Sequence, residues 1–164
     1  MNPSSTEHVW DLMERVRFCM FCTFDGTKLR SRPMGAFVRR EEGAIYFFTD
    51  LRAHKDDDIR AFPKVCLGFA DTSDQKYASV SGTAEVILDR QKIKELWSIP
   101  VKIWWQSPDD PNILLVKVTP EDAEYWDSPG NLISSVKVAF ALATGSHVDY
   151  GEHQRASFPK KASS

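Results

Sequence analysis

The chain has 164 residues, of which 42% are hydrophobic, which is enough for one domain around a single core, since domains commonly contain about 100 to 150 residues. Its 21 Lys and Arg are balanced by 23 Asp and Glu. This balance provides no basic field that would attract a phosphate backbone, so we exclude nucleic acid as an expected partner.

The amino-terminal stretch is polar and acidic, whereas a secretory signal is basic and then apolar. No run approaches the roughly 18 apolar residues that a membrane span requires. We therefore expect a cytoplasmic protein without membrane contact.

The cysteines Cys19, Cys22 and Cys66 are an odd number, which does not indicate a disulfide framework, and we expect reduced thiols. Cys19 and Cys22 are spaced as C-x-x-C. Residues three apart in a strand point to opposite faces, however, and Cys66 stands by itself in another segment, so we interpret all three as small core residues. The histidines are scattered without the spacing of a zinc or iron site, and no metal is expected.

The first half of the chain predicts a helix and then three antiparallel strands. Apolar residues recur at helical spacing over residues 5–17, which predicts an amphipathic helix that covers one end of a sheet. Three β-rich runs separated by turn residues then predict strands over 18–24, 29–38 and 44–49. The charged stretch 50–62, followed by Pro63, predicts a loop that leads into a short helix.

The second half returns to strands. They are predicted over 64–71 and 77–89, with Gly82 at a bulge or a tight barrel bend, and Asp89 is positioned to cap a further helix. Residues 98–112 contain three prolines and predict a long structured loop. The remaining elements are expected to be strands at 113–120 and 123–127 and a closing amphipathic helix at 132–143.

These elements predict one domain over residues 1–143 and a polar, partly disordered tail over residues 144–164. Six or seven strands interrupted by short helices indicate an α+β barrel and do not support alternating parallel β/α units.

The predicted second and third strands carry the residues suited to bind an anion. Arg32 and Met34 share one face by the two-residue period, and Pro33 removes a ladder donor, which marks an irregular spot where a ligand can meet backbone. An arginine beside such a spot can hold an anion.

Thr49 ends the third strand, and His54 and Lys55 stand at the entry to the predicted helix, where free amides and the helix dipole favour a phosphate. Alternatively, His54 and Lys55 belong to a solvated helix face, and spacing does not decide between the two.

The aromatic residues provide candidates for binding a flat ring such as isoalloxazine, which is usually enclosed by apolar or aromatic groups. The candidates are Phe47, Phe48, Tyr77, Trp104, Trp105 and Trp126. Most aromatic residues are simply core. Trp104 and Trp105 are neighbours in a predicted loop, where burial is less automatic, so they are interpreted as pocket or interface residues.

Five segments in order resemble the FMN-binding split-barrel family related to pyridoxamine 5′-phosphate oxidase, and within it the general stress protein 26 branch. They are RSRPM, YFFTDLRAHK, KVCLGFAD, KYASVSGTAEV and WWQSPDDPNILLVKVTPEDAEYWD. The resemblance covers about residues 5–126. It implies an α+β, mainly antiparallel six-stranded split barrel with short peripheral helices, which forms a homodimer and binds FMN between its subunits.

The resemblance also implies roles for particular residues. Arg32, Pro33 and Met34 match the strand that contacts the flavin and its ribityl phosphate. Phe48 and Thr49 match the aromatic and threonine pair beside the ribityl chain. His54 and Lys55 match the basic pair that holds the phosphate. Tyr77 and Ser79 match the strand that the partner subunit contributes. Trp105 and Trp126 match the residues that close the ring pocket.

Three departures from the family pattern concern the namesake oxidase reaction. Ala53 stands where the oxidases often have a phosphate-binding serine, and Phe37 where they commonly have lysine. The carboxy-terminal arginine and histidine motif that holds the vitamin substrate has no counterpart in GSHVDYGEHQR. We therefore do not expect pyridoxamine 5′-phosphate oxidase activity.

The expected function is that of an FMN-dependent oxidoreductase of the general stress protein type, with an unknown substrate and no catalytic residue that can be named. One alternative is a flavin-binding or sensing module without turnover. A second is a split barrel that uses haem or a deazaflavin, although His54 stands at a phosphate-type helix start and not over a macrocycle.

Overall fold

One antiparallel sheet of eight strands dominates the computed structural model, which describes residues 3–53, 55–127, 139–145 and 152–159, with the backbone alone at residues 3, 4, 55, 99 and 152. The strands are β1 (Phe18–Phe24), β2 (Leu29–Gly35), β3 (Phe37–Arg39), β4 (Ala44–Asp50), β5 (Lys64–Asp71), β6 (Lys76–Ile87), β7 (Ile113–Asp127) and β8 (Glu152–Ser157). The helices are α1 (Pro3–Val16), η1 (Arg40–Glu42), η2 (Leu51–Ala53), α2 (Lys55–Ala61), α3 (Arg90–Leu96) and α4 (Ile99–Lys102).

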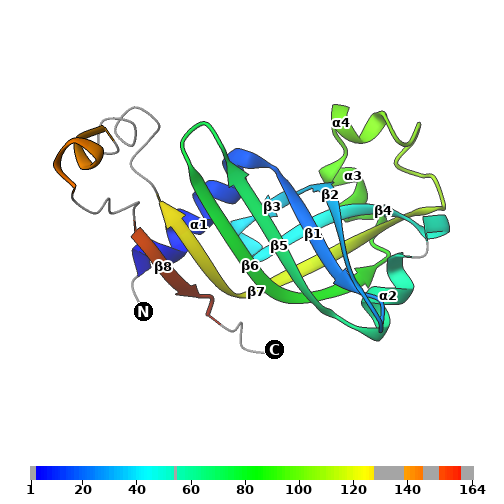
Figure 1. The fold of residues 1–164 in the computed structure, drawn as a ribbon. Helices are drawn as coiled ribbons and strands as arrows, with labels where there is room; N and C mark the ends of the chain where they lie inside the picture. The colour runs from blue at the N-terminus through cyan, green and yellow to red at the C-terminus, as the bar shows by residue number, and fades with distance from the viewer. Residues whose placement is uncertain (1–2, 54, 128–138, 146–151, 160–164) are drawn as a thin grey trace.

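The sheet curls into a barrel that is split on one side. Its strand order is β2-β1-β5-β6-β7-β4-β3, with β8 added to β7. Although β2 and β4 stand far apart in this order, residues of the two strands contact each other, so the two ends of the sheet approach (Figure 1). The fold is thus the expected α+β split barrel.

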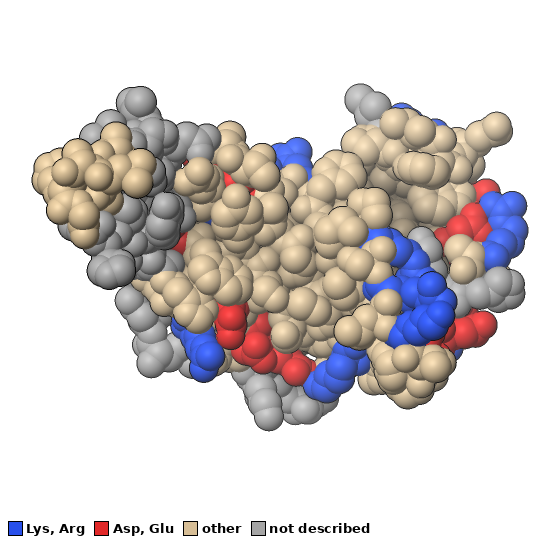
Figure 2. Space-filling model, in the orientation of Figure 1, with Lys and Arg blue, Asp and Glu red and all other residues tan. Residues whose placement is uncertain are grey.

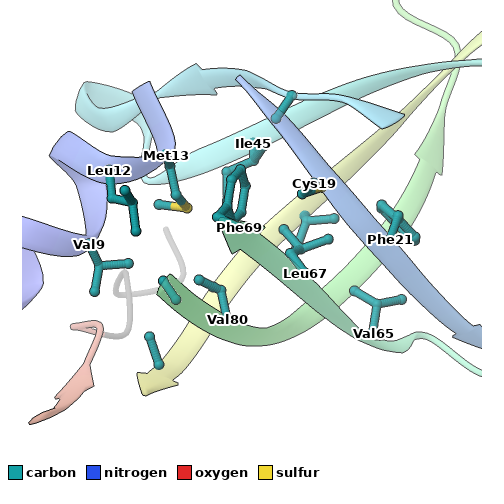
Figure 3. Close-up of a cluster of buried hydrophobic side chains, with 14 of the residues drawn as sticks. Val9, Leu12, Met13, Cys19, Phe21, Ile45, Val65, Leu67, Phe69 and Val80 are labelled. Carbon is teal, nitrogen blue, oxygen red and sulfur yellow. The ribbon is translucent and has the colours of Figure 1, made fainter. Parts of the chain in front are cut away.

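Strand alternation fills the barrel with apolar side chains. In β5, Val65, Leu67 and Phe69 are buried while the residues between them face outward. Helix α1 closes one end of the barrel and packs Val9, Leu12 and Met13 against this core, as Figure 3 shows. The predicted helix over residues 5–17 is therefore confirmed, with bounds shifted by one or two residues.

The strand count is higher than the six expected. The run 29–38 breaks between Gly35 and Phe37 into β2 and β3, which lie at opposite edges of the sheet, because the chain crosses the split there. The two strands expected at 113–120 and 123–127 are one continuous strand, β7, which pairs with β6 from Leu115 to Asp127. The first expectation joined two strands into one, and the second divided one strand into two, so both were wrong.

The polar carboxy-terminal tail also differs from expectation. Residues 152–157 form β8, which pairs with β7 from Asp122 to Asp127, so this part of the tail extends the sheet. Of the expected helix over 132–143, only residues 139–143 are described. They are helical, and the rest of that prediction lies outside the described residues. The loop expected at 98–112 contains the short helix α4, with Pro100 in its first turn, where proline needs no hydrogen-bond partner.

Two local predictions are confirmed in detail. The side chain of Asp89 accepts a hydrogen bond from the backbone N–H of Lys92 and caps α3. The register of β6 against β7 shifts between Ser81 and Gly82, so a bulge stands at the expected glycine. A Cβ atom on Gly82 would meet the carbonyl oxygen of Thr119 at 2.5 Å, which explains why this position lacks a side chain.

The cysteines are free thiols, as expected, but only Cys19 lies in the core. Cys22 and Cys66 are half-buried on the outer face of the sheet, directly opposite each other on β1 and β5. The interpretation of all three as core residues, with Cys66 by itself, was therefore wrong.

Within the described residues, no helix has the length and apolar character needed to span a membrane. The same residues contain no group of three or more potential metal ligands from histidine, cysteine and acidic side chains.

Candidate functional site

A pocket of about 350 Å3 opens where the sheet is split. Strands from both sides of the split, η2 and the segment around α4 contribute its walls: Phe18, Pro33, Met34, Gly35, Phe37, Phe48, Thr49, Asp50, Ala53, Pro100, Val101, Trp104 and Trp105. Its size is within the range of about 300 to 1,000 Å3 common for small-molecule sites.

One wall is formed by β2, which is an edge strand of the sheet. Pro33 lies opposite Met20 on β1. The missing N–H of Pro33 costs no hydrogen bond between strands, because the other side of β2 has no partner strand in the described sheet. The prediction that Pro33 marks an edge where a ligand can approach backbone agrees with this placement. Met34 and Gly35 continue the same wall.

The opposite wall is aromatic. The Phe48 ring stands edge-on to the Phe37 ring, with centroids 5.2 Å apart, and lies 6.0 Å from the Trp105 ring. Phe48 belongs to a second apolar cluster, in which α3 and α4 cover the outer side of β4. These helices therefore hold Trp105 beside the pocket and exclude water from its aromatic side.

Thr49 places an unpartnered hydroxyl at the pocket. The residue is 3% exposed, and its Oγ1 atom has no hydrogen-bond partner within the described part of the chain. Burying a hydroxyl without a partner costs free energy, so such atoms are uncommon in folded proteins. Thr49 also lines the pocket, so a polar ligand there would satisfy this hydroxyl once the side chain rotates toward it, because Oγ1 itself is buried.

Asp50 is the charged side chain among the pocket residues. Its carboxylate accepts hydrogen bonds from Arg52 Nε at 2.8 Å and Nη2 at 2.5 Å, and from the Trp105 indole Nε1 at 3.3 Å. The Arg52 side-chain bonds, followed by the Arg52 backbone N–H, hold the pKa of Asp50 well below its usual range. Asp50 is therefore an ionised anchor for Trp105 and not a proton donor.

The predicted phosphate-binding residues are only partly described. On β2, Arg32 lies opposite Phe21 and Arg30 lies opposite Thr23, so both arginines are on the inward-facing side of the strand. Arg32 Nη1 donates a hydrogen bond to Thr23 Oγ1 at 3.3 Å. Arg32 lies outside the pocket lining. Figure 2 shows Lys and Arg side chains gathered over the end of the barrel where β1, β2 and α2 lie.

His54 lies outside the described residues, and Lys55 is described only by its backbone, at the start of α2. Their predicted contact with a phosphate therefore stays a prediction.

Tyr77, Ser79 and Trp126 lie elsewhere, on the outer face of the sheet. Tyr77 stands directly opposite Trp126, and the Trp126 ring is stacked on His153 of β8 with centroids 5.1 Å apart. None of these residues lines the pocket. The predicted site residues thus divide within one chain into a pocket group, Pro33, Met34, Phe48, Thr49 and Trp105, and an outer-face group, Tyr77, Ser79 and Trp126.

Comparison with known proteins agrees with this geometry. The family described as "Pyridoxamine 5′-phosphate oxidase like" matches residues 4–149. The chain belongs to this family.

Two curated relatives of the oxidase-like chain resemble it over most of its length. Protein bli-3 of Neurospora crassa is 29% identical over 143 residues, which are 79% of this chain and 68% of bli-3. General stress protein 26 of Bacillus subtilis is 28% identical over 123 residues, which are 71% of this chain and 84% of that protein.

Two solved structures support the same relationship. A putative general stress protein 26 from Jannaschia sp. CCS1 is 28% identical, with a TM-score of 0.79 over 96% of this chain and 100% of that one. The general stress FMN/FAD binding protein from Xanthomonas citri is 25% identical, with a TM-score of 0.68 over 77% of this chain and 90% of that one.

Several pocket residues of this oxidase-like chain were missed by sequence reasoning. Phe18 begins β1, with Arg17 between it and the end of α1. Its one local signal is that it is a large apolar residue on the exposed face of β1. Pro100 and Val101 lie in the segment that was expected to be a loop, where no pattern distinguished them. Asp50 follows Thr49, but only the fold shows that its carboxylate meets Trp105, 55 residues later. Of the other ring candidates, Phe47 is fully buried in the barrel core and Trp104 lines the pocket.

Proposed function

We propose that the chain is an FMN-dependent oxidoreductase that acts as a homodimer, with the flavin ring in the pocket at the split. The observation that carries this proposal is the buried, unpartnered Thr49 hydroxyl at a pocket with aromatic walls. The solved relative from Xanthomonas citri that is named as an FMN/FAD binding protein supports the choice of cofactor.

The pocket residues fit a flavin in their chemistry. Phe37, Phe48 and Trp105 offer aromatic faces and edges for a flat ring, and Pro33 and Met34 offer an apolar surface on the other side. The Thr49 hydroxyl suits the polar ribityl chain. The phosphate would be held by Arg32, His54 and Lys55 near the start of α2, where Ala53 contributes no hydroxyl.

The outer face of the sheet is the surface we assign to the partner subunit. Phe18, Met20 and Tyr77 are 63%, 44% and 38% exposed on it, which is high for large apolar side chains. Small residues such as Gly68 and Ser79 lie between them, and Figure 2 shows a broad area without charged side chains over β1 and β5. A second copy packed here would bring its own Tyr77, Ser79 and Trp126 toward the flavin.

When bound, FMN supplies the ability to accept and return a hydride, so the chain needs no nucleophile of its own. The residues of the chain orient the ring, exclude water and hold the phosphate. Asp50 stays ionised in its bonds with Arg52 and Trp105 and does not act as an acid. Phe37 leaves the pocket without the lysine of the namesake oxidases, so we propose a substrate other than pyridoxamine phosphate.

The absorbance spectrum of the purified chain tests the proposal, together with identification of the cofactor by mass. We expect bound FMN that is bleached by NADH or NADPH and reoxidised by air, in a protein that elutes as a dimer. Bound flavin that resists every nicotinamide donor would favour a binding or sensing module without turnover. A Soret band, a deazaflavin mass, or tight FMN binding by a monomer would each overturn part of the proposal.

A further inference from the structure

Strand β8 adds a third ring to the outer-face group of predicted site residues. In the register of the sheet, Tyr77 on β6 lies opposite Trp126 on β7, and Trp126 lies opposite His153 on β8. The three rings therefore form one row across neighbouring strands, at the end of the sheet where β8 is added (Figure 1). Because directly opposite side chains on one face of a sheet contact each other, His153 is placed to act on Trp126.

The His153 ring is stacked on the indole of Trp126. The ring centroids are 5.1 Å apart, and the two ring planes are inclined by 15°. Trp126 nevertheless remains 37% exposed. The imidazole thus restricts the indole from one side, while the exposed part of the indole stays available to a second copy of the chain.

Glu124 contacts the imidazole from the same face of the sheet. Its Oε2 atom lies 3.4 Å from His153 Nε2, and its Oε1 atom lies 3.5 Å from Arg155 Nε. Glu124 and Trp126 are two residues apart on β7, so both side chains point to the outer face. His153 is therefore held between a ring and a carboxylate.

The inner face of the carboxy-terminal segment attaches it to the barrel independently of His153. Ser5 Oγ of α1 donates a hydrogen bond to Gln154 Oε1 at 2.7 Å. The Trp10 ring stands edge-on to the ring of Phe158, which directly follows β8, with centroids 5.3 Å apart. A substitution at His153 should therefore change the outer face while β8 stays paired with β7.

We propose that His153 is a positioning residue for the flavin site of the other subunit, where it orients Trp126 for contact with the FMN bound by the partner. The inference rests on the proposed function, in which a second copy packs on the outer face and brings Trp126 toward the flavin. It assigns β8 a part in a cofactor site whose pocket belongs to the other chain.

A restrained indole should bind a flat ring more tightly than an unrestrained one. A free tryptophan side chain loses rotamer freedom when a ligand orders it, and orientation in advance removes part of that cost. A single aromatic contact of this kind is of modest strength. Loss of the His153 ring should therefore weaken FMN binding without abolishing it, because the contacts to the phosphate remain.

Fluorescence titration of the full chain with FMN tests the proposal. His153→Ala should raise the Kd for FMN about 2- to 10-fold, whereas His153→Phe, which keeps a ring, should stay within about twofold of the parent chain. Trp126→Ala should weaken binding at least as much as His153→Ala. The double variant should bind no more weakly than Trp126→Ala by itself, because His153 acts through Trp126.

Two matched controls separate positioning from stability. His8→Ala removes a histidine contact with Tyr125, the buried neighbour of Trp126, whose ring centroid lies 5.9 Å from that of His8. Arg155→Ala removes the other β8 partner of Glu124. Both controls should leave the Kd for FMN unchanged, whatever their urea midpoints. Equal weakening by His8→Ala and His153→Ala would reduce the effect to a loss of stability and overturn the proposal.

Mixed dimers show which subunit His153 serves. A chain with His153→Ala is combined with a chain that carries Arg32→Ala and Lys55→Ala and holds no flavin of its own. The intact pocket then belongs to one chain and the intact His153 to the other. We expect the parental Kd at half the parental stoichiometry. The raised Kd of the His153→Ala homodimer would instead place His153 at the pocket of its own chain and overturn the proposal.

The parent chain separates this inference from the proposed function. A parent chain that binds no FMN, or binds it as a monomer, overturns the proposed function and this inference with it. A dimeric parent chain that binds FMN, with an unchanged Kd in His153→Ala, overturns the role of His153 and leaves the proposed function in place.

Discussion

The indole Nε1 of Trp105 donates a hydrogen bond to Oδ2 of Asp50 at 3.3 Å, which ties the segment after α4 to the end of β4 beside the pocket. Asp50 in turn is held ionised by Arg52. One carboxylate thus orients an aromatic side chain that originates 55 residues away in the sequence.

Trp105→Phe keeps an aromatic ring but removes the donor, and Asp50→Asn keeps the shape but removes the charge. We expect either change to raise the Kd for FMN about 2- to 10-fold, because a hydrogen bond of this kind contributes roughly 0.5 to 1.5 kcal/mol. Fluorescence titration with FMN measures the effect. Trp10→Phe, in the core far from α4, is the control; unchanged affinity in both pocket variants would show that this bond does not position Trp105.

Thr49→Val tests the unpartnered hydroxyl with almost no change of shape. Because Thr49 Oγ1 is buried without a partner in the described chain, we expect the variant without flavin to be equally stable or up to about 1 kcal/mol more stable in urea unfolding. FMN affinity should fall at the same time. A clear loss of stability in the flavin-free protein would mean that the hydroxyl already has a partner.

Arg32→Ala combined with Lys55→Ala should lose most bound flavin while the protein remains folded. Charge-assisted contacts to phosphate contribute on the order of 1.5 to 3 kcal/mol each. Cofactor content after purification and circular dichroism give the two readouts. Arg30→Ala is the matched control, because Arg30 lies on the same face of β2 but is paired with Asp25 at 3.0 Å. Stoichiometric FMN in the double variant would place the phosphate elsewhere.

Gly82→Ala should be strongly destabilising. Its Cβ would lie 2.5 Å from a backbone oxygen of Thr119, and the bulge cannot yield without moving β7, so we expect a loss of about 2 kcal/mol or more. Gly68→Ala provides the comparison, since its Cβ would meet atoms no closer than 3.9 Å. Equal denaturation midpoints for the two variants would contradict a steric requirement at the bulge.

Acid should weaken the fold below pH 4. The backbone N–H groups of Lys28 and Thr27, and the Arg30 side chain, lower the pKa of Asp25 from 3.8 to about 2. A carboxylate with a lowered folded pKa stabilises the protein above its unfolded pKa, and this contribution disappears as the pH falls from about 4 to 2. Urea midpoints measured from pH 5 to pH 2.5 should therefore fall, and less steeply in Asp25→Asn than in the parent chain. If the urea midpoints of Asp25→Asn and of the parent chain fell equally with pH, Asp25 would not be the cause of the acid sensitivity.

Local patterns in the sequence were sufficient for the elements whose stability is local. The alternation of Cys19, Phe21 and Thr23 with outward residues defines β1, and Asp89 caps α3, because period and capping depend only on near neighbours. The ordered segments likewise identified the family, and they named Pro33, Met34, Phe48, Thr49 and Trp105, which the fold gathers at one pocket.

Only the tertiary structure decided which distant residues meet. The addition of β8 to β7, the pairing of Cys22 with Cys66 and the contact of Asp50 with Trp105 all depend on register or packing between segments far apart in the chain. A one-residue change of register reverses the face of every side chain, and local composition does not specify it. The sequence by itself therefore determined the type of barrel and several residues on both walls of its pocket, while long-range strand pairing decided where the barrel splits and which cysteines lie opposite each other.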